Sequence, residues 1–72
     1  MIEVFKTDVK DKIFASILVE QIHKMYTGYT ANFDLDDCDN ILRVKSSSGI
    51  VQADPLILLL EKYGFRAEVL PD

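Results

Sequence analysis

The feature that most constrains this chain is a hydrophobic repeat that switches between two periods. Near the start, Ile2 and Val4 flank a glutamate and Phe5 follows, which predicts a short strand over about residues 2–7. From Ile13 onward, apolar residues recur at spacings of three and four, which predicts a helix. We expect one apolar helix face, made of Ile13, Phe14, Ile17, Leu18, Ile22, Met25 and Tyr26.

Polar residues and a glycine bound this helix. Asp8 and Asp11 are its two candidate N-caps, because a carboxylate can accept hydrogen bonds from the free amides of the first turn. Gly28 is expected to end the helix, since glycine readily adopts a positive φ.

Two further strands are predicted in the middle of the chain. Ala31, Phe33 and Leu35 alternate with polar residues, which is typical of a half-buried strand. Residues 36–40 are rich in Asp and Asn, which favour turns, and a second apolar strand follows over residues 41–45. The two strands are therefore expected to pair as a hairpin.

The last third of the chain predicts a helix and a strand. Asp54 suits the N-cap and Pro55 suits the first helical position, so the second helix is expected to begin there. Gly64 is expected to end it. Alternation over residues 65–69 predicts a final strand, which Pro71 terminates.

The resulting order is strand, helix, strand, strand, helix, strand. Two right-handed β–α–β crossovers then interleave into one four-stranded antiparallel sheet with both helices on one face. We therefore predict a ferredoxin-like βαββαβ sandwich of the α+β class. Residues 1–72 are expected to form a single domain, because a chain of this length has room for one small core.

Composition restricts the partners and the compartment. Eight basic against twelve acidic residues give a net charge of −4, which argues against binding to nucleic acid or to an anionic membrane. The longest apolar run, residues 56–60, is far shorter than the roughly 20 residues that span a bilayer. We expect a cytoplasmic protein without a cofactor, as a monomer or a weak homodimer.

The residues that could carry chemistry are few. Cys38 is the one cysteine, so an intramolecular disulfide and a CxxC pair are both excluded, and its acidic neighbours disfavour the thiolate. The acidic turn fails as a calcium loop, because Asp39 and Lys45 stand where the loop needs Gly and Glu. His23 is expected to be a partly exposed helix residue that cannot chelate a metal together with Met25. We predict no catalytic residue and no metal site.

On this topology, the chain resembles the heavy-metal-associated domain of copper chaperones and metal-transporting ATPases. The resemblance covers nearly the whole chain, including the hairpin and residues 61–65, which are similar to the family's K-x-x-G-Y/F ending. The family's metal loop, M-x-C-x-x-C, aligns with residues 9–14, where Asp11 and Phe14 replace the two cysteines. Because thiolates hold monovalent copper, the resemblance implies the family fold without its metal binding. By the same topology, we expect Cys38 to lie far from this loop.

In the resembling domains, partner proteins dock beside the metal loop and the first helix. The corresponding candidate partner-binding residues here are Lys10, Asp11, Lys12 and Tyr63. The resemblance therefore implies a non-catalytic binding module for a protein partner of unknown identity. Two alternatives stay open: residual or altered handling of copper or zinc, with a dimer that brings two Cys38 thiols together, and a small-molecule-sensing regulatory domain.

Overall fold

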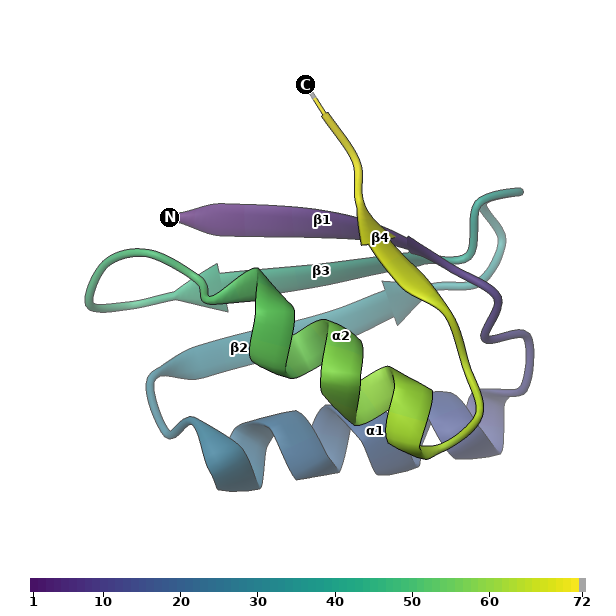
Figure 1. Ribbon diagram of the computed structural model, residues 1–72, viewed down its shortest axis with the longest axis horizontal. Helices are drawn as coiled ribbons and strands as arrows, with labels where there is room; N and C mark the ends of the chain where they lie inside the picture. Colours follow the sequence, from purple (N-terminus) through teal and green to yellow (C-terminus); the bar gives the residue numbers. More distant parts are fainter. Residues whose placement is uncertain (72) are drawn as a thin grey trace.

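The structure, a computed structural model that describes residues 1–71, has the predicted order of elements. They are β1 (Ile2–Thr7), α1 (Lys12–Met25), β2 (Tyr29–Asp34), β3 (Ile41–Ser46), α2 (Ala53–Lys62) and β4 (Ala67–Val69). The strands form one antiparallel sheet in the order β2-β3-β1-β4, and both helices cover the same face of it (Figure 1). This α+β architecture confirms the predicted fold class and is compatible with a ferredoxin-like βαββαβ sandwich.

The core lies between the sheet and the two helices. Phe5 of β1 pairs with Leu42 of β3, and both side chains are fully buried against the helical layer. Leu18 of α1 and Leu56 of α2 are fully buried on the other side of this core. Within residues 1–71, neither helix has the length and apolar character that crossing a membrane requires.

The buried face of α1 is narrower than predicted. Its buried residues are Ala15, Leu18 and Ile22. Ile13, by contrast, is 70% exposed, because it lies about 140° around the helix from Leu18. Three further residues of the predicted face are also classed as exposed: Phe14, Ile17 and Met25. A face of seven apolar residues is wider than one sheet can cover, so its outer part stays in contact with water.

The ends of α1 follow the prediction at the N-terminus only. Asp11 is the N-cap, in an extended conformation. The prediction that Gly28 ends the helix is wrong, because α1 already stops at Met25 and Tyr26 is extended. The Tyr26 ring stacks on Tyr29, with centroids 4.6 Å apart, which starts β2 two residues earlier than predicted.

The start of α2 also differs from the prediction. The helix begins at Ala53, after Gln52, and its N-cap makes no side-chain hydrogen bond. Asp54 therefore lies within the first turn and Pro55 is the third helical residue, where its missing N–H leaves no hydrogen bond unmade. The backbone N–H of Gln52 donates to the Tyr29 hydroxyl at 2.8 Å, which connects the start of α2 to β2.

The end of α2 confirms the role of Gly64. Its φ is 88°, and its amide donates to the Glu61 carbonyl at 2.9 Å, while the Phe65 amide donates to the Leu60 carbonyl at 2.9 Å. This pair of hydrogen bonds is a Schellman motif, which requires a left-handed residue after the helix. Because residues 65 and 66 complete this turn, β4 starts at Ala67, later than predicted.

Candidate functional site

Three connections meet at the end of the sheet where β1 finishes (Figure 1). They are residues 8–11, 35–40 and 63–66. The Thr7 amide donates to the Asp39 carbonyl at 3.0 Å, and the Asp8 amide donates to the Arg66 carbonyl at 3.3 Å. The Asp8 carboxylate accepts a hydrogen bond from the Arg66 amide in return, at 2.7 Å. The predicted partner-binding residues all lie in or beside these joined connections.

Asp11 is the residue that the predicted resemblance aligns with the family's first cysteine. Its carboxylate Oδ1 accepts a hydrogen bond from the Ile13 amide at 2.7 Å, and its carbonyl accepts one from the Ala15 amide at 2.9 Å. A carboxylate at this position satisfies a free helix amide and interacts favourably with the helix dipole. The side chain of Asp11 therefore stabilises the start of α1.

Phe14 is the residue that the predicted resemblance aligns with the family's second cysteine. Its ring meets the ring of Phe65 edge-on, with centroids 5.5 Å apart and an interplanar angle of 66°. Aromatic pairs with this geometry stabilise a fold beyond the area that they bury. Phe14, which is 39% exposed, thus joins the start of α1 to the connection that follows α2.

The other predicted residues share this end of the molecule and are spread around the start of α1 and the end of α2. Lys10 and Lys12 are exposed on either side of Asp11, and Tyr63 is half-buried as the C-cap of α2. Lys12 and Phe14 point to opposite sides of α1, because two helical positions are about 200° apart. Lys12 faces β2, whereas Phe14 faces the residues that follow α2.

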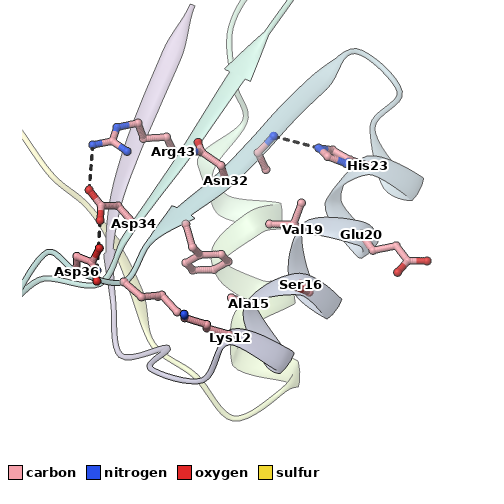
Figure 2. A pocket seen from close by; sticks show the side chains of 13 residues that line it. Lys12, Ala15, Ser16, Val19, Glu20, His23, Asn32, Asp34, Asp36 and Arg43 are labelled. Carbon is pink, nitrogen blue, oxygen red and sulfur yellow. Dashed lines mark hydrogen bonds and ion pairs between the residues drawn. The ribbon is translucent and has the colours of Figure 1, made fainter.

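A groove of about 790 Å³ runs between α1 and β2 (Figure 2). Ser16 and Val19 belong to its helix wall, and Phe33 belongs to its strand wall. His23 also lines the groove, and its Nε2 accepts a hydrogen bond from the Ala31 amide at 3.0 Å (Figure 2). His23 is an exposed helix residue, and its contact with β2 could not be deduced from the periodicity of α1.

Cys38 lies at the same end of the sheet as the connection from β1 to α1, so the prediction that it lies far away is wrong. β1 and β2 are both antiparallel to β3, and the turn after β2 therefore returns to the end of β1. The Cys38 thiol is free and exposed. The prediction failed because it did not follow the strand directions through the hairpin.

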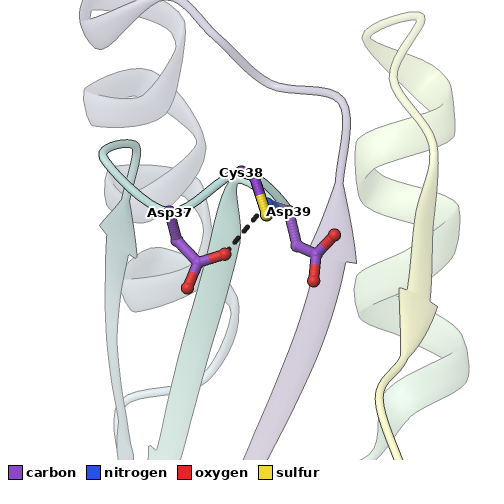
Figure 3. A group of neighbouring side chains, drawn as sticks. All are labelled: Asp37, Cys38 and Asp39. Atoms are coloured by element: carbon purple, nitrogen blue, oxygen red, sulfur yellow. Dashed lines mark hydrogen bonds between the residues drawn. The ribbon is translucent and has the colours of Figure 1, made fainter.

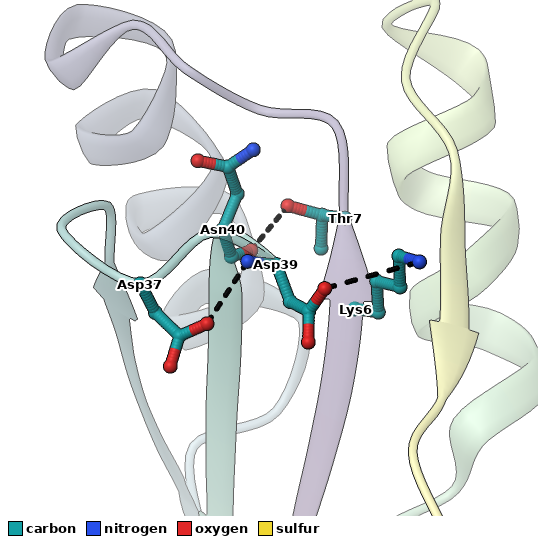
Figure 4. Close-up of polar contacts among 5 residues, drawn as sticks. All are labelled: Lys6, Thr7, Asp37, Asp39 and Asn40. Carbon is teal, nitrogen blue, oxygen red and sulfur yellow. Dashed lines mark hydrogen bonds and ion pairs between the residues drawn. The ribbon is translucent and has the colours of Figure 1, made fainter.

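The hairpin turn is held by its own polar groups. Asp37, Cys38 and Asp39 each place one potential ligand atom within 4.8 Å of the others (Figure 3). The Asp37 carboxylate, however, accepts the Asp39 amide at 2.9 Å, as in an Asx turn. The Asp39 carboxylate lies 3.8 Å from Lys6 Nζ, and the Thr7 hydroxyl donates to the Asn40 carbonyl at 2.6 Å (Figure 4). These contacts fasten the turn to β1.

Exposed apolar residues lie beside the charged residues at the start of α1. Ile13 and Ile17 follow Lys12 on the side of the helix that is turned from the core. On α2, Leu58 is 63% exposed and was not among the residues singled out from the sequence. The sequence indicates this exposure, because Leu58 is two residues from both Leu56 and Leu60 and such a position points away from the buried face of the helix.

No protein-family model, curated protein or solved structure matches this chain. The resemblance to the heavy-metal-associated domain therefore stays a prediction. The function of the protein has to be inferred from the side chains that its fold brings to the surface.

Proposed function

We propose that this chain is a non-catalytic protein-interaction module of the heavy-metal-associated-domain type that has lost the metal-binding cysteines. The observation that carries the proposal is the exposed apolar start of α1 between charged residues. We define the α1 docking surface as Lys10, Asp11, Lys12, Ile13, Phe14, Ile17 and Tyr63.

The apolar part of this surface supports docking because it leaves hydrophobic area in water. Ile13 is 70% exposed, and its neighbours Phe14 and Ile17 are exposed on adjoining turns. Fully burying a side chain such as isoleucine contributes about 1.5–3 kcal/mol. Neighbouring exposed apolar residues with a charged rim are typical of interfaces between proteins, whereas single ones are ordinary.

The charged part supports selectivity for the partner. Lys10 and Lys12 flank Asp11, and all three side chains are exposed. Charges at the rim of an interface mainly raise the rate of association with a complementary partner and exclude like-charged ones. The two lysines therefore favour a partner that presents acidic groups at the edge of an apolar patch.

The structural contacts of Asp11 and Phe14 support the loss of thiolate metal binding. The carboxylate of Asp11 caps α1, and the ring of Phe14 packs on Phe65. A carboxylate and a phenyl ring lack the soft sulfur ligands that monovalent copper prefers. Both positions have thus acquired roles in the fold.

Site-specific photo-crosslinking in cells that make the protein tests this function. A photoreactive amino acid replaces Ile17 in one variant and, as a matched control, Lys45 on the uncovered sheet face in another. We expect a discrete crosslinked partner from position 17 and none from position 45. The Lys10→Glu, Lys12→Glu double variant should lose that product. Identical products from both positions, or products that ignore the charge reversal, would contradict the proposal.

A further inference from the structure

β2 is an edge strand, so one side of its backbone is turned away from the sheet. The direction of the β3 amides shows which residues of β2 are turned outward. The Ser46 amide donates to the Met1 carbonyl at 2.8 Å, and the Met1 ammonium donates to the Ser46 carbonyl at 3.2 Å. Antiparallel ladders alternate, so the residues two and four positions before Ser46, Val44 and Leu42, also direct their backbone groups toward β1.

Ala31 and Phe33 therefore direct their backbone N–H and C=O groups away from the sheet. They are the β2 residues opposite Val44 and Leu42, whose own groups already bond to β1. The outward N–H of Ala31 is bonded to His23 Nε2 at 3.0 Å. None of the loop or side-chain hydrogen bonds formed by residues 1–71 involves the backbone of Phe33. A strand beside β2 could bond to these groups.

The groove between α1 and β2 lies along this edge and can hold the side chains of such a strand. Its volume of about 790 Å³ is bounded by Ala15 and Val19 of α1 and by Phe33 of β2. An extended chain advances about 3.3 Å per residue, so six residues match the length of β2. Alternate side chains of that chain would pack on the apolar groups of the groove.

The charge at one end of the groove selects a basic occupant. Asp34 and Asp36 line this end together with the cations Lys12 and Arg43, and Asp37 follows them in the turn, so carboxylates outnumber cations there by three to two. Arg43 pairs with Asp34 at 3.8 Å (Figure 2). The carboxylates of Asp36 and Asp37 take part in no ion pair within residues 1–71. Two copies of this chain would each contribute a net charge of −4, which disfavours a second copy as the occupant.

We propose that the groove between α1 and β2 binds an extended, basic segment of another protein, which pairs with the edge of β2 as an additional strand. The backbone of Phe33 supplies one N–H and one C=O for this pairing, and Ala31 supplies a second C=O. His23 competes with the segment for the Ala31 amide. This site lies on the opposite side of α1 from Phe14 and shares only Lys12 with the α1 docking surface.

An NMR titration of the ¹⁵N-labelled protein tests the proposal. The probe is an end-capped octapeptide of alternating valine and lysine, and the control is the octapeptide of alternating valine and glutamate. We expect saturable shift changes that are largest at the Ala31 and Phe33 amides with the lysine peptide only. Two further peptides carry N-methyl groups on the backbone nitrogens of the valines only or of the lysines only. One of them should lose binding and the other should keep it, because only alternate amides of the added strand face β2.

Three variants separate strand pairing from other modes of binding. Ser16→Arg fills the groove and should weaken the lysine peptide at least about 10-fold. Asp36→Lys should weaken it by about 2- to 5-fold by removing a complementary charge. His23→Ala frees the Ala31 amide and should strengthen binding by about 2- to 10-fold, as expected for one additional hydrogen bond. Ile17→Glu, on the α1 docking surface, is the matched control and should leave the affinity unchanged.

Four outcomes would overturn the proposal. Shift changes centred on Ile13 and Phe14 would assign the peptide to the α1 docking surface. Equal binding of the glutamate peptide would exclude the charge selection. Concentration-dependent shifts at Phe33 without peptide would assign the edge to a second copy of this chain. The absence of any shift at millimolar peptide would mean that no strand pairs with β2 and that His23 covers its edge. None of these outcomes changes the crosslinking result expected at position 17.

Discussion

Truncating two apolar residues of α1 to alanine should have very different effects on stability. Leu18 is fully buried, whereas Ile13, five residues earlier, is 70% exposed. Leu18→Ala removes buried methyl groups and leaves a cavity, which costs about 3 kcal/mol. Ile13→Ala removes little buried area and improves helix propensity, so its effect should lie within about 0.5 kcal/mol. Periodicity alone would assign both residues to one buried face and predict similar losses.

Urea denaturation followed by circular dichroism at 222 nm measures this difference. For a domain whose total stability is on the order of 5–10 kcal/mol, Leu18→Ala should lower the midpoint markedly while Ile13→Ala leaves it in place. The measurement is made at two protein concentrations differing 20-fold. A loss above about 2 kcal/mol for Ile13→Ala at both concentrations would refute the assigned face of α1. A loss at the higher concentration alone would mean that another copy of the chain buries Ile13.

Three further predictions concern the end of the sheet where the connections meet. In urea denaturation, Asp11→Ala should lower the free energy of unfolding by about 1 kcal/mol. Asp11→Asn should lower it by much less, because asparagine also caps helices. Thr7→Val should cost about 1–3 kcal/mol in the same assay, because the buried hydroxyl bonds Asn40 and the Val9 amide, whereas Thr7→Ser should retain most of the stability. In a competition with a chelator, the reduced wild-type protein should bind monovalent copper no tighter than micromolar. The Asp11→Cys, Phe14→Cys double variant should gain a stoichiometric copper site, because residues three apart at a helix N-terminus can bring two thiolates together. Failure of that variant to gain the site, while folded by circular dichroism, would contradict the alignment of residues 9–14 with the metal loop.

The order of elements could be predicted because each signal is local. The strand at Ile2–Thr7, the cap at Asp11 and the stop at Gly64 depend on neighbouring residues alone. The start of α2 could not be predicted in this way. The helix begins at Ala53, and the backbone N–H of the preceding Gln52 donates to the Tyr29 hydroxyl across the fold, a contact that the residues around Asp54 do not reveal.

The candidate site was predictable in part. Lys10, Asp11, Lys12 and Tyr63, which were chosen from the resemblance, do lie at one end of the molecule. The exposure of Ile13 depends on which part of a wide apolar face the sheet covers. Periodicity gives the direction of a side chain around its own helix, but it does not give the width of the surface that packs against that helix.

By itself, the sequence determined the α+β class and the alternation of periods that produces it. Only the tertiary structure decided what Asp11 and Phe14 contact, that the Cys38 turn lies against the end of β1, and that His23 reaches the edge of β2. The physical reason is that helix and strand patterns arise from residues that are close together in the sequence. Contacts such as Phe14 with Phe65, or His23 with Ala31, exist only after separate elements have packed together.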